Sequence, residues 1–456
     1  MTLKNKPHIS ILGGGPGGLG VAFYAKKASL PFTLYEANSQ VGGNARTLTY
    51  KDFLFDTGAH RWHDKFPDIT QDLLELLGKD ITKIHVPSQI FYRNRYIDFP
   101  LSPFNLLTNL GLGKCLRAGV ELILANLNKS KPTDGSFESF ALRAYGRTIA
   151  EVFLLNYSEK LWGRPCRLLS PSISGKRLKG LNLSTFLKEI FQGTKSKTEH
   201  LDGAFYYPHY GIGMIANLMA EFCGNENIET NARVTKLCHD GKNFTAIEIN
   251  GTKKIPADQI VSTLPLPLLL NLMEPAPEKA ILDLSRSLHF RNLILVGIFL
   301  DKPTVNRNAS VYFPTSDFIF SRIYEPRNRS PRMAPEGKTS LLAEVPCSPG
   351  DDTWNLKDED VIKIVQDQLT KIGWIKPGEL IGTVALRFPY AYPILELGFD
   401  EKVAAIFESL KHFQNLKLSG RNGEFKYIHI HDLMKMGKDT VQELLQTPAF
   451  NEPLMV

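Results

Sequence analysis

The chain has 456 residues, of which 43% are hydrophobic and 22% charged, and its formal net charge is +7. A chain of this length is too long for one simple core, so we expect two or three packed modules of a globular protein. No arginine-rich tract or nucleic-acid-binding motif is present, which argues against nucleic acid as a partner, and the modest positive charge suits a site for an anionic small molecule.

Cysteine usage and the first residues bear on the compartment. The five cysteines are scattered and lack CxxC spacing, which disfavours a disulfide framework or a structural zinc site and favours a reducing compartment. Residues 1–7 are polar and lack the apolar core of a signal peptide. We therefore expect a cytoplasmic protein without a metal site, and the sequence leaves the oligomeric state open.

The first elements in chain order are typical of a parallel, doubly wound α/β sheet. Residues 8–12 form a short apolar run, residues 19–28 have the pattern of a helix, and residues 32–35 have the pattern of a second strand. A further short strand is expected at 52–58. This order of strand, turn, helix and strand predicts a Rossmann-like beginning of the chain.

A glycine-rich turn joins the first strand to the first helix. Gly13, Gly15 and Gly18 match the GxGxxG pattern, in which the glycines permit a tight turn, close approach of a pyrophosphate, and close helix–strand packing. Glu36, at the end of the second strand, is placed to accept hydrogen bonds from a ribose. The alternative is a turn that merely contains many glycines. The candidate cofactor-binding residues of this stretch are Gly13, Gly15, Pro16, Gly17, Gly18, Glu36 and Ala37.

A second glycine pair follows soon after Glu36. The block Gly42-Gly43-Asn44 resembles the extension found in flavoproteins of the glutathione-reductase-like superfamily, where it lies along the flavin's pyrophosphate and ribityl chain. This resemblance favours FAD over NAD as the cofactor. An ordinary surface turn is the alternative.

The segment from about residue 66 to residue 200 is expected to be mostly helical. Amphipathic helical spacing occurs at 68–78, 136–155 and 182–193. The most apolar long stretch, 104–127, contains Lys114, Arg117 and Glu121, which argues against a membrane-spanning helix. We expect a buried or half-buried helix there, with a membrane-surface helix as the alternative.

Beyond residue 200 the pattern changes to short β segments separated by turns. Strands are expected within 227–237, 244–251 and 259–265, then at 288–300, 310–313, 317–324, 339–346 and 416–419, with helices at 357–372 and 432–445. The strands between 288 and 346 predict a largely antiparallel sheet for the substrate. The expected modules are a discontinuous FAD-binding domain (1–100, 201–275 and 391–456), a mainly helical insertion (101–200) and the antiparallel substrate domain (276–390).

Several short motifs, in the same order along the chain, resemble UDP-galactopyranose mutase. They are Gly42 to Ala45, Gly58-Ala59-His60 with His63, Tyr157 to Gly163, His289 to Leu293, Ala391 to Ile394, and Gly420-Arg421 with Tyr427 and Asp432. The wider superfamily includes protoporphyrinogen oxidase, amine oxidases and phytoene desaturases. Two segments depart from the family pattern. The family has an arginine-bearing strand at the place of residues 172–177, and it has a second tyrosine that residues 427–431 lack. These departures bear on the identity of the substrate and not on the flavin.

The resemblance implies an FAD-dependent enzyme that acts on a nucleotide-sugar. In that family reduced flavin N5 attacks the anomeric carbon, the nucleotide diphosphate leaves, and the sugar ring recloses smaller without net redox change. Arginine and tyrosine side chains would hold the diphosphate. The catalytic candidates are His60, His63, Arg177, Arg291, Tyr392 and Tyr427, and the substrate-binding candidates are Trp162, Lys176, Arg177, Arg291, Tyr392 and Tyr427. The further cofactor-binding candidates are Gly42, Gly43, Asn44, Ala59, His60, Val234, Gly420, Arg421 and Asp432.

Simpler structural interpretations stand beside these roles. An arginine on a strand can serve an ion pair, Tyr392 and Trp162 can be core aromatics, and Asp432 can cap a helix. At the level of the whole protein, the alternatives are a conventional FAD oxidoreductase that removes hydride from a small organic substrate, and a flavin-binding protein without catalysis. The arginine and tyrosine set favours the nucleotide-sugar hypothesis.

Overall fold

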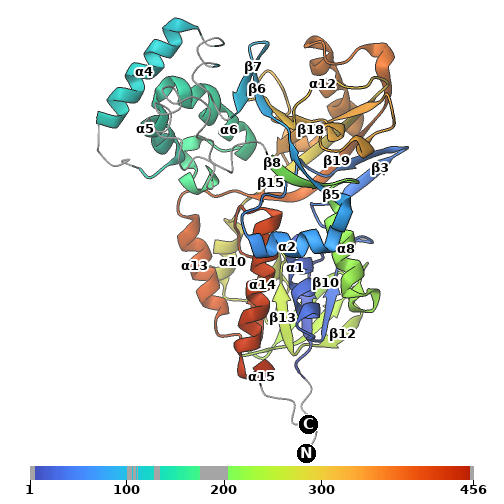
Figure 1. Cartoon of the computed structure of the whole chain (residues 1–456). Coiled ribbons are helices and arrows are strands. Elements are labelled where there is room, and N and C mark those ends of the chain that lie inside the picture. The colour runs from blue at the N-terminus through green and yellow to red at the C-terminus, as the bar shows by residue number, and fades with distance from the viewer. Residues whose placement is uncertain are drawn as a thin grey trace, which may run out of the picture.

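The computed structural model describes residues 6–99, 105, 109, 111–127, 134–174 and 204–451. In Figure 1 the lower half of the molecule is the α/β module, the upper right is a sheet with helix α12, and the upper left is a helical module with α4, α5 and α6. This arrangement confirms the expected α/β class, with a Rossmann-like module, a helical insertion and a largely antiparallel sheet.

A five-stranded parallel sheet forms the centre of the α/β module. Its strand order is β20-β13-β1-β2-β9, so the first strand lies in the middle. Its strands are β1 (Ile9–Leu12), β2 (Phe32–Tyr35), β9 (Ile228–Glu229), β13 (Gln259–Ser262) and β20 (Leu416–Leu418). Segments that lie far apart in the sequence therefore build one sheet, and the edge at the carboxyl end of β1 meets the glycine turn.

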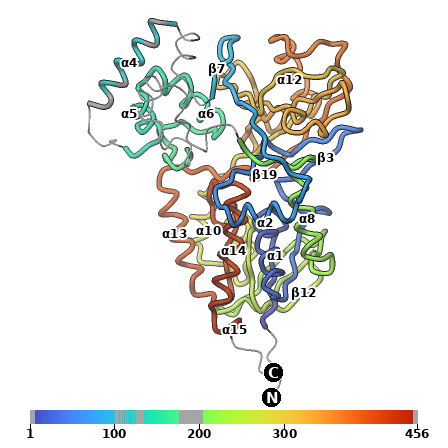
Figure 2. The backbone as a smooth tube through the Cα atoms, in the orientation of Figure 1, coloured from blue at the N-terminus to red at the C-terminus, as the bar shows by residue number. Residues whose placement is uncertain are grey.

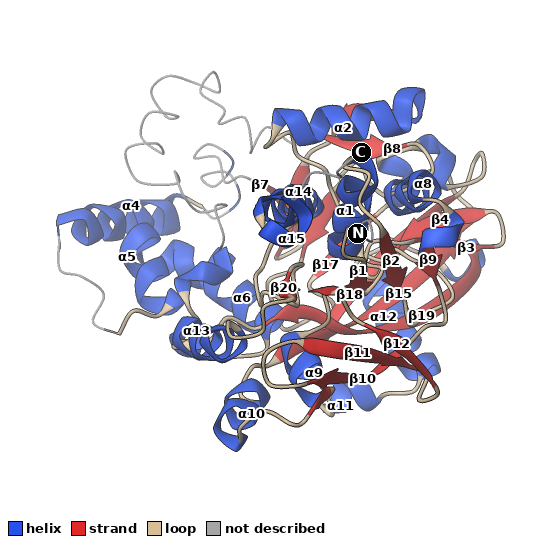
Figure 3. Cartoon of the chain, turned by 90° about the horizontal axis from the view of Figure 1, so that it is seen from below, coloured by secondary structure: helices blue, strands red, loops and turns tan. Residues whose placement is uncertain are grey.

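Three helices cover one face of this sheet, and a small sheet covers the other. Ile9 and Ile11 of β1 pack with apolar residues of α1 (Pro16–Lys27), α8 (Gly213–Cys223) and α14 (Ile430–Gln446), whereas Leu12 packs on the opposite side with strands β10 and β11. This division follows from the alternation of side chains along a strand. Seen from below, the helices and the small sheet lie on opposite sides of the parallel strands (Figure 3). The small sheet has the order β12-β11-β10-β14, with β10 (Val234–His239), β11 (Phe244–Ile249), β12 (Lys253–Pro256) and β14 (Met273–Glu274).

Helices α1 and α14 touch through their backbones, and they run side by side in Figure 2. A Cβ atom at Gly437 would lie 2.4 Å from the carbonyl carbon of Gly20, so this crossing admits no side chain. Because α14 comes from the end of the chain and α1 from its beginning, the crossing brings residues 420–432 beside the glycine turn. The other helices of this half are α2 (Pro67–Leu77), α9 (Leu266–Asn271), α10 (Lys279–Arg286), α13 (Phe399–Leu410) and α15 (Pro448–Asn451).

A seven-stranded sheet forms the upper right of the molecule. Its order is β19-β15-β18-β17-β16-β6-β7, and every neighbouring pair is antiparallel except β16 with β6. Strand β15 is buried along all eleven residues because its apolar run has packed layers on both faces. The strands are β6 (Ser88–Tyr92), β7 (Arg95–Phe99), β15 (Phe290–Leu300), β16 (Ser310–Tyr312), β17 (Arg322–Tyr324), β18 (Thr339–Cys347) and β19 (Leu380–Pro393); α11 (Asp352–Asn355) and α12 (Asp358–Lys371) follow β18.

Three sequence-based expectations differ from this structure. Residues 81–99 are not helical but form β5 (Ile81–His85), β6 and β7. Strands β6 and β7 form a local hairpin, whereas β5 and β6 also pair with β8 (Ala204–Pro208) and β16, which lie more than a hundred residues away. The predicted strand at 317–324 shrinks to β17, and the long strand β19 was not expected before residue 391. A two-stranded ribbon of β3 (Thr47–Tyr50) and β4 (Phe53–Asp56) completes the strands.

The helical module contains α4 (Leu112–Leu127), α5 (Phe137–Ile149), a π-helical segment (Ala150–Leu155) and α6 (Asn156–Trp162). On α4, the side chains of Leu116, Val120, Ile123 and Leu124 are between 54% and 62% exposed. This exposed stripe differs from the buried or half-buried helix that we expected. The predicted helix at 182–193 lies outside the described residues. None of the helices in the described part of the chain has the length and apolarity needed to cross a lipid bilayer.

Candidate flavin and substrate site

The first glycine turn links β1 to α1 through contacts that only glycine allows. Gly13 has φ +102°, and a Cβ atom at Gly18 would lie 1.9 Å from the Gly13 carbonyl oxygen. A Cβ atom at Gly17 would lie 2.9 Å from Cα of Gly420, so the turn also packs against the returning C-terminal segment. Helix α1 begins at Pro16 without a side-chain cap and without an acidic residue in its first turn. Its first N–H groups are therefore available to an anionic group such as a pyrophosphate.

The second glycine pair packs on the first turn. The Gly42 N–H donates to the Gly14 carbonyl oxygen at 2.8 Å, and a Cβ atom at Gly43 would lie 3.0 Å from Cα of Gly15. Gly42 and Gly43 have positive φ angles of +107° and +52°. Two turns without side chains thus face each other, which fits an extended dinucleotide lying along bare backbone.

Glu36 points toward this junction and is buried. Its carboxylate accepts hydrogen bonds from the Gly14 N–H at 2.8 Å and from the backbone and side-chain N–H groups of Asn38 at 2.8 and 2.6 Å. Ala37 follows Glu36 directly, and half-buried Val234 begins the neighbouring strand β10. The carboxylate therefore stands where the sequence pattern requires a ribose acceptor.

Asn44, Ala59 and His60 meet next to the second glycine pair. The Asn44 carbonyl oxygen accepts from His60 Nε2 at 2.7 Å and from the Thr57 hydroxyl at 2.8 Å, and the Ala59 N–H donates to Glu344 Oε1 at 2.9 Å. Burial lowers the pKa of His60 to about 3. Since a carbonyl oxygen only accepts, neutral His60 carries its proton on Nε2 and presents Nδ1 as an acceptor.

Arg421 lies between two tyrosine rings. Its guanidinium carbon is 4.8 Å from the centre of the Tyr392 ring and 5.0 Å from that of Tyr427, and the Trp162 ring meets these two edge-on at 6.1 and 5.2 Å. We call Trp162, Tyr392, Arg421 and Tyr427 the Arg421 cluster. Burial raises the pKa of Tyr392, so its hydroxyl stays protonated at neutral pH. The cluster joins α6, the end of β19 and the segment that follows Gly420.

A second buried arginine beside the cluster was missed by the sequence reasoning. Arg322 pairs with Glu344 through three contacts of 2.6 to 2.9 Å, and the same carboxylate accepts from Ala59. Its guanidinium carbon lies 6.0 Å from the Tyr312 ring, and Tyr157 packs on that ring at 5.6 Å. The one available signal was Glu344 inside the otherwise apolar strand β18, because a charge in such a place requires a partner.

Arg291 is occupied by the protein itself. Its Nε donates to the Leu161 carbonyl oxygen at 3.0 Å, and its Nη2 donates to the carbonyl oxygens of Lys160 and Pro346 at 3.2 and 3.1 Å. Its Nη1 contacts the Ser348 hydroxyl and lies 3.6 Å from an Asp351 carboxylate oxygen. Four of the five N–H groups of this guanidinium therefore donate to protein acceptors, and the fifth faces the Asp351 carboxylate, so the side chain is largely committed to the protein in this arrangement.

Of the remaining predicted residues, Asp432 lies in the first turn of α14, His63 lies near that helix, and two are outside the described chain. The His431 ring lies 6.0 Å from that of His63 and 5.6 Å from that of His429. Asp432 accepts from the His429 N–H at 3.1 Å, as a helix cap does, and also pairs with Lys65. Lys176 and Arg177 are outside the described residues. Within the described part of the chain, no group of three or more His, Cys, Asp or Glu side chains is arranged to hold a metal ion.

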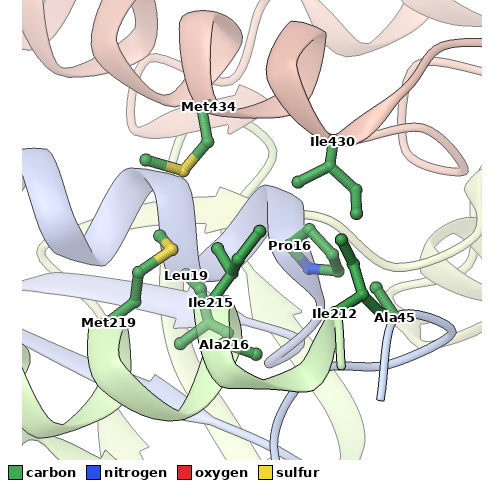
Figure 4. A pocket seen from close by; sticks show the side chains of 9 residues that line it. All are labelled: Pro16, Leu19, Ala45, Ile212, Ile215, Ala216, Met219, Ile430 and Met434. Atoms are coloured by element: carbon green, nitrogen blue, oxygen red, sulfur yellow. The ribbon is translucent and has the colours of Figure 1, made fainter. Parts of the chain in front are cut away.

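A small apolar pocket lies behind the glycine turn, between α1, α8 and α14 (Figure 4). Its lining consists of Pro16, Leu19, Ala45, Ile212, Ile215, Ala216, Met219, Ile430 and Met434. None of these side chains carries a group for acid–base or nucleophilic chemistry. We therefore regard the pocket as packing space that supports the turn, not as a substrate site.

Comparison with known proteins places this site in a family. Residues 16–383 match the model of flavin containing amine oxidoreductases. The chain belongs to this family. It is an FAD-dependent enzyme, and the bare backbone of the two glycine turns, closed by Glu36, is where its residues fit the cofactor.

Three further similarities cover nearly the whole enzyme. Coproporphyrinogen III oxidase from Bacillus subtilis strain 168 is 24% identical, over 96% of this chain and 98% of that protein. Reduced UDP-galactopyranose mutase superposes with a TM-score of 0.84 at 21% identity, with 98% of each chain covered. Putrescine oxidase bound to putrescine follows with a TM-score of 0.65 at 16% identity, over 97% of this chain and 99% of that chain. The two structures share the fold with this enzyme.

Proposed function

We propose that this flavoenzyme rearranges a nucleotide-sugar without net oxidation, in the manner for which UDP-galactopyranose mutase is named. The observation that carries the proposal is the Arg421 cluster, in which a guanidinium lies between two tyrosines beside the flavin turn. Arginine and tyrosine donors suit the oxygens of a diphosphate. The high TM-score to the mutase structure supports the same choice.

The chain's residues would divide the work as follows. Tyr392 and Tyr427 donate hydrogen bonds to the diphosphate, Arg421 supplies a fixed positive charge, and the buried Trp162 ring supports the two tyrosines. Arg322, whose charge is balanced by Glu344, fixes the Tyr312 side of the site. Keeping both fragments of the substrate in place favours their recombination over their escape.

Histidines and the bound flavin complete the proposed site. Neutral His60 fixes the Asn44 loop beside the cofactor and can accept a proton only through Nδ1. We keep His63, Lys176 and Arg177 as proposed substrate-side residues. Reduced flavin, when bound, supplies the nucleophile for the anomeric carbon.

A net oxidation is the second candidate, and the similarity to coproporphyrinogen III oxidase over nearly the whole chain favours it. In that case the same cluster would hold the anionic groups of a substrate that gives up hydride to the flavin. The two candidates differ in whether product formation consumes an electron acceptor.

The deciding experiment uses the purified yellow holoenzyme. In one arm it is reduced with dithionite under argon and incubated with UDP-galactose or UDP-galactofuranose, and the products are separated by chromatography. Interconversion of the two sugars without change in the flavin spectrum supports the proposal. In the other arm the oxidised enzyme meets coproporphyrinogen III in air, and bleaching of the flavin with oxygen uptake would overturn it.

Two variants connect the result to the site. Tyr392→Phe removes only a hydroxyl, and we expect a rate loss of about tenfold to a hundredfold for a hydrogen bond made to the reacting substrate. Arg322→Lys should lose more, since lysine cannot keep the bidentate pair with Glu344. The matched control is Arg332→Lys, because Arg332 contacts the exposed ring of Tyr210 on the surface.

A further inference from the structure

Three consecutive residues at the start of β15 contact the segments that carry the aromatic rings of the Arg421 cluster. Phe290, Arg291 and Asn292 begin the strand, between β18 and β19. Side chains alternate along a strand, so Phe290 and Asn292 leave one face and Arg291 leaves the other. Arg291 reaches the end of α6, Asn292 reaches Tyr390 in β19, and Phe290 reaches both Tyr390 and Phe425. These three segments carry the aromatic rings of the cluster.

Arg291 fastens the end of α6, the helix that ends in Trp162. The carbonyl oxygens of Lys160 and Leu161 belong to the last turn of this helix, where carbonyl groups lack helical partners, and both accept from the guanidinium. Gly163 then turns the chain with φ +65°, and a Cβ atom there would lie 2.5 Å from the guanidinium carbon. The arginine thus fixes the end of α6 to β15 at the point where Trp162 enters the cluster.

Asn292 supports a bulge that precedes Tyr392. In the β15–β19 ladder Arg291 pairs with Tyr392 and Leu293 pairs with Phe388, so the three residues 389–391 stand opposite Asn292 alone. The Asn292 Oδ1 atom accepts from the N–H of Tyr390 at 3.2 Å, inside this bulge. A bulge redirects the side chain beside it, so its shape sets the direction of Tyr392.

Phe290 holds two residues with unfavourable backbone angles. Tyr390 and Phe425 have φ values of +55° and +52°, a conformation that bulky residues rarely adopt. Both rings pack edge-on against Phe290, at 5.1 and 5.2 Å. Tyr390 lies two residues before Tyr392, and Phe425 lies two residues before Tyr427.

We propose that Phe290-Arg291-Asn292 is the positioning element of the Arg421 cluster, with one side chain for each of Trp162, Tyr392 and Tyr427. None of the three is a catalytic residue, because each acts through the ring that it places. The proposal rests on the proposed function only for the identity of the ligand that the cluster receives.

Hydrogen exchange followed by mass spectrometry on the FAD-loaded enzyme tests the placement directly. We expect Arg291→Met to speed exchange about tenfold or more in residues 156–163, where the docked helix end protects the amides. Asn292→Ala should do so in 389–393, and Asn292→Asp, which keeps the Oδ1 acceptor, should restore protection. Equal exchange in the variants and the parent enzyme would overturn the proposal.

Arg387→Met is the matched control. Arg387, in the middle of β19, contacts Asp358 and the Leu356 carbonyl oxygen, much as Arg291 contacts α6. We expect it to loosen residues 354–358 and to leave 156–163 unchanged. A general rise in exchange across the whole chain in Arg291→Met, without one in Arg387→Met, would show lost stability instead of lost placement and would also count against the proposal.

A double-mutant cycle separates positioning from direct contact with substrate. The probe is UDP, titrated against the flavin absorbance of the holoenzyme in the parent, Arg291→Met, Trp162→Phe and double variants. Positioning predicts that Arg291→Met weakens UDP binding about tenfold in the parent and much less when Trp162 is already gone. An equal loss in both backgrounds would assign the diphosphate contact to Arg291 and overturn the positioning role. Failure of UDP to bind any form would count against the nucleotide-sugar proposal, while the exchange experiment would still decide the placement.

Discussion

Single residues at the glycine turn allow close backbone contacts that leave no space for side chains, and we propose that the flavin binds along this bare backbone. A Cβ atom added at Gly18 would lie 1.9 Å from the Gly13 carbonyl oxygen, and one added at Gly17 would lie 2.9 Å from Cα of Gly420. Among the described residues, the Glu36 carboxylate is the charged group that accepts a hydrogen bond from the backbone of this turn, at the Gly14 N–H. We therefore propose that the turn recognises the shape of the cofactor through its backbone and the ribose through the Glu36 side chain.

Replacement of Glu36 by glutamine tests this division. We expect the dissociation constant for FAD to rise about tenfold, as befits the loss of about 1.4 kcal/mol from a charged acceptor. Quenching of FAD fluorescence on titration into the apoprotein measures it. Glu229→Gln is the control, because Glu229 ends the neighbouring strand β9 and pairs with Lys253 instead. A similar loss in both variants would show that Glu36 has no special contact with the cofactor.

The residue scale also shows which site features the sequence could predict. Gly13, Gly18 and Glu36 are linked by short stretches of chain with fixed spacing, so their joint role is visible in a pattern. Arg322 and Glu344 meet only because β17 and β18 pair, and Arg291 meets α6 across 130 residues. No local pattern records such meetings, so the sequence could suggest that Arg291 matters but not what it contacts.

At the scale of elements, helix α6 is attached to the seven-stranded sheet at two points. Arg291 holds its end, and the Lys160 ammonium donates to the carbonyl oxygens of Phe313 and Thr315 at 3.0 and 2.8 Å. Burial lowers the pKa of Lys160 to about 7, from an ordinary value of 10.5. The second attachment is therefore linked to pH.

This linkage gives a pH-dependent stability with a definite sign. Between about pH 7 and pH 10 the unfolded chain keeps the Lys160 proton and the folded chain loses it, so the free energy of unfolding rises with pH in that window. Below pH 7 both states hold the proton and the contribution is constant. We expect the thermal midpoint of the parent enzyme, relative to Lys160→Met, to increase from pH 7 to pH 9. A difference that falls or stays flat would contradict the buried lysine.

The exposed stripe on α4 makes a second prediction at this scale. Val120→Gln and Leu124→Gln should each change stability by less than about 0.5 kcal/mol, because both side chains are more than half exposed. Ala118→Gln on the same helix should cost about 1 to 3 kcal/mol, because Ala118 is only 6% exposed and a larger side chain overfills its place. Thermal unfolding of the three variants measures these changes. An equal loss of stability in all three would show that the stripe is packed against protein.

At the scale of the whole molecule, the cofactor site draws on segments from both ends of the chain. Residues 13–18, 36–46, 57–60 and 420–432 approach one another, and the pairing of α1 with α14 keeps them together. A ligand that contacts all four segments acts as a brace between them. Removal of FAD should therefore weaken the whole α/β module.

We expect the apoprotein to unfold at a lower temperature, and its midpoint to rise as FAD is added back. At a free FAD concentration a hundred times its dissociation constant, the gain is about 2.7 kcal/mol. Scanning calorimetry of apoprotein with increasing FAD measures the shift. NAD at the same concentrations is the control, and an equal shift with NAD would contradict the specificity for flavin.

The middle position of β1 in its sheet has a consequence for biosynthesis. Strand β1 can pair on one side only after β13 has been synthesised. The outer strand β20 and helix α14 follow only after some four hundred residues have been made. Until Gly420 packs against Gly17, the nascent polypeptide has the glycine turn but lacks the C-terminal segment that completes the proposed cofactor site. We therefore expect FAD to bind late in biosynthesis, and nascent chains that end before residue 420 should not bind it.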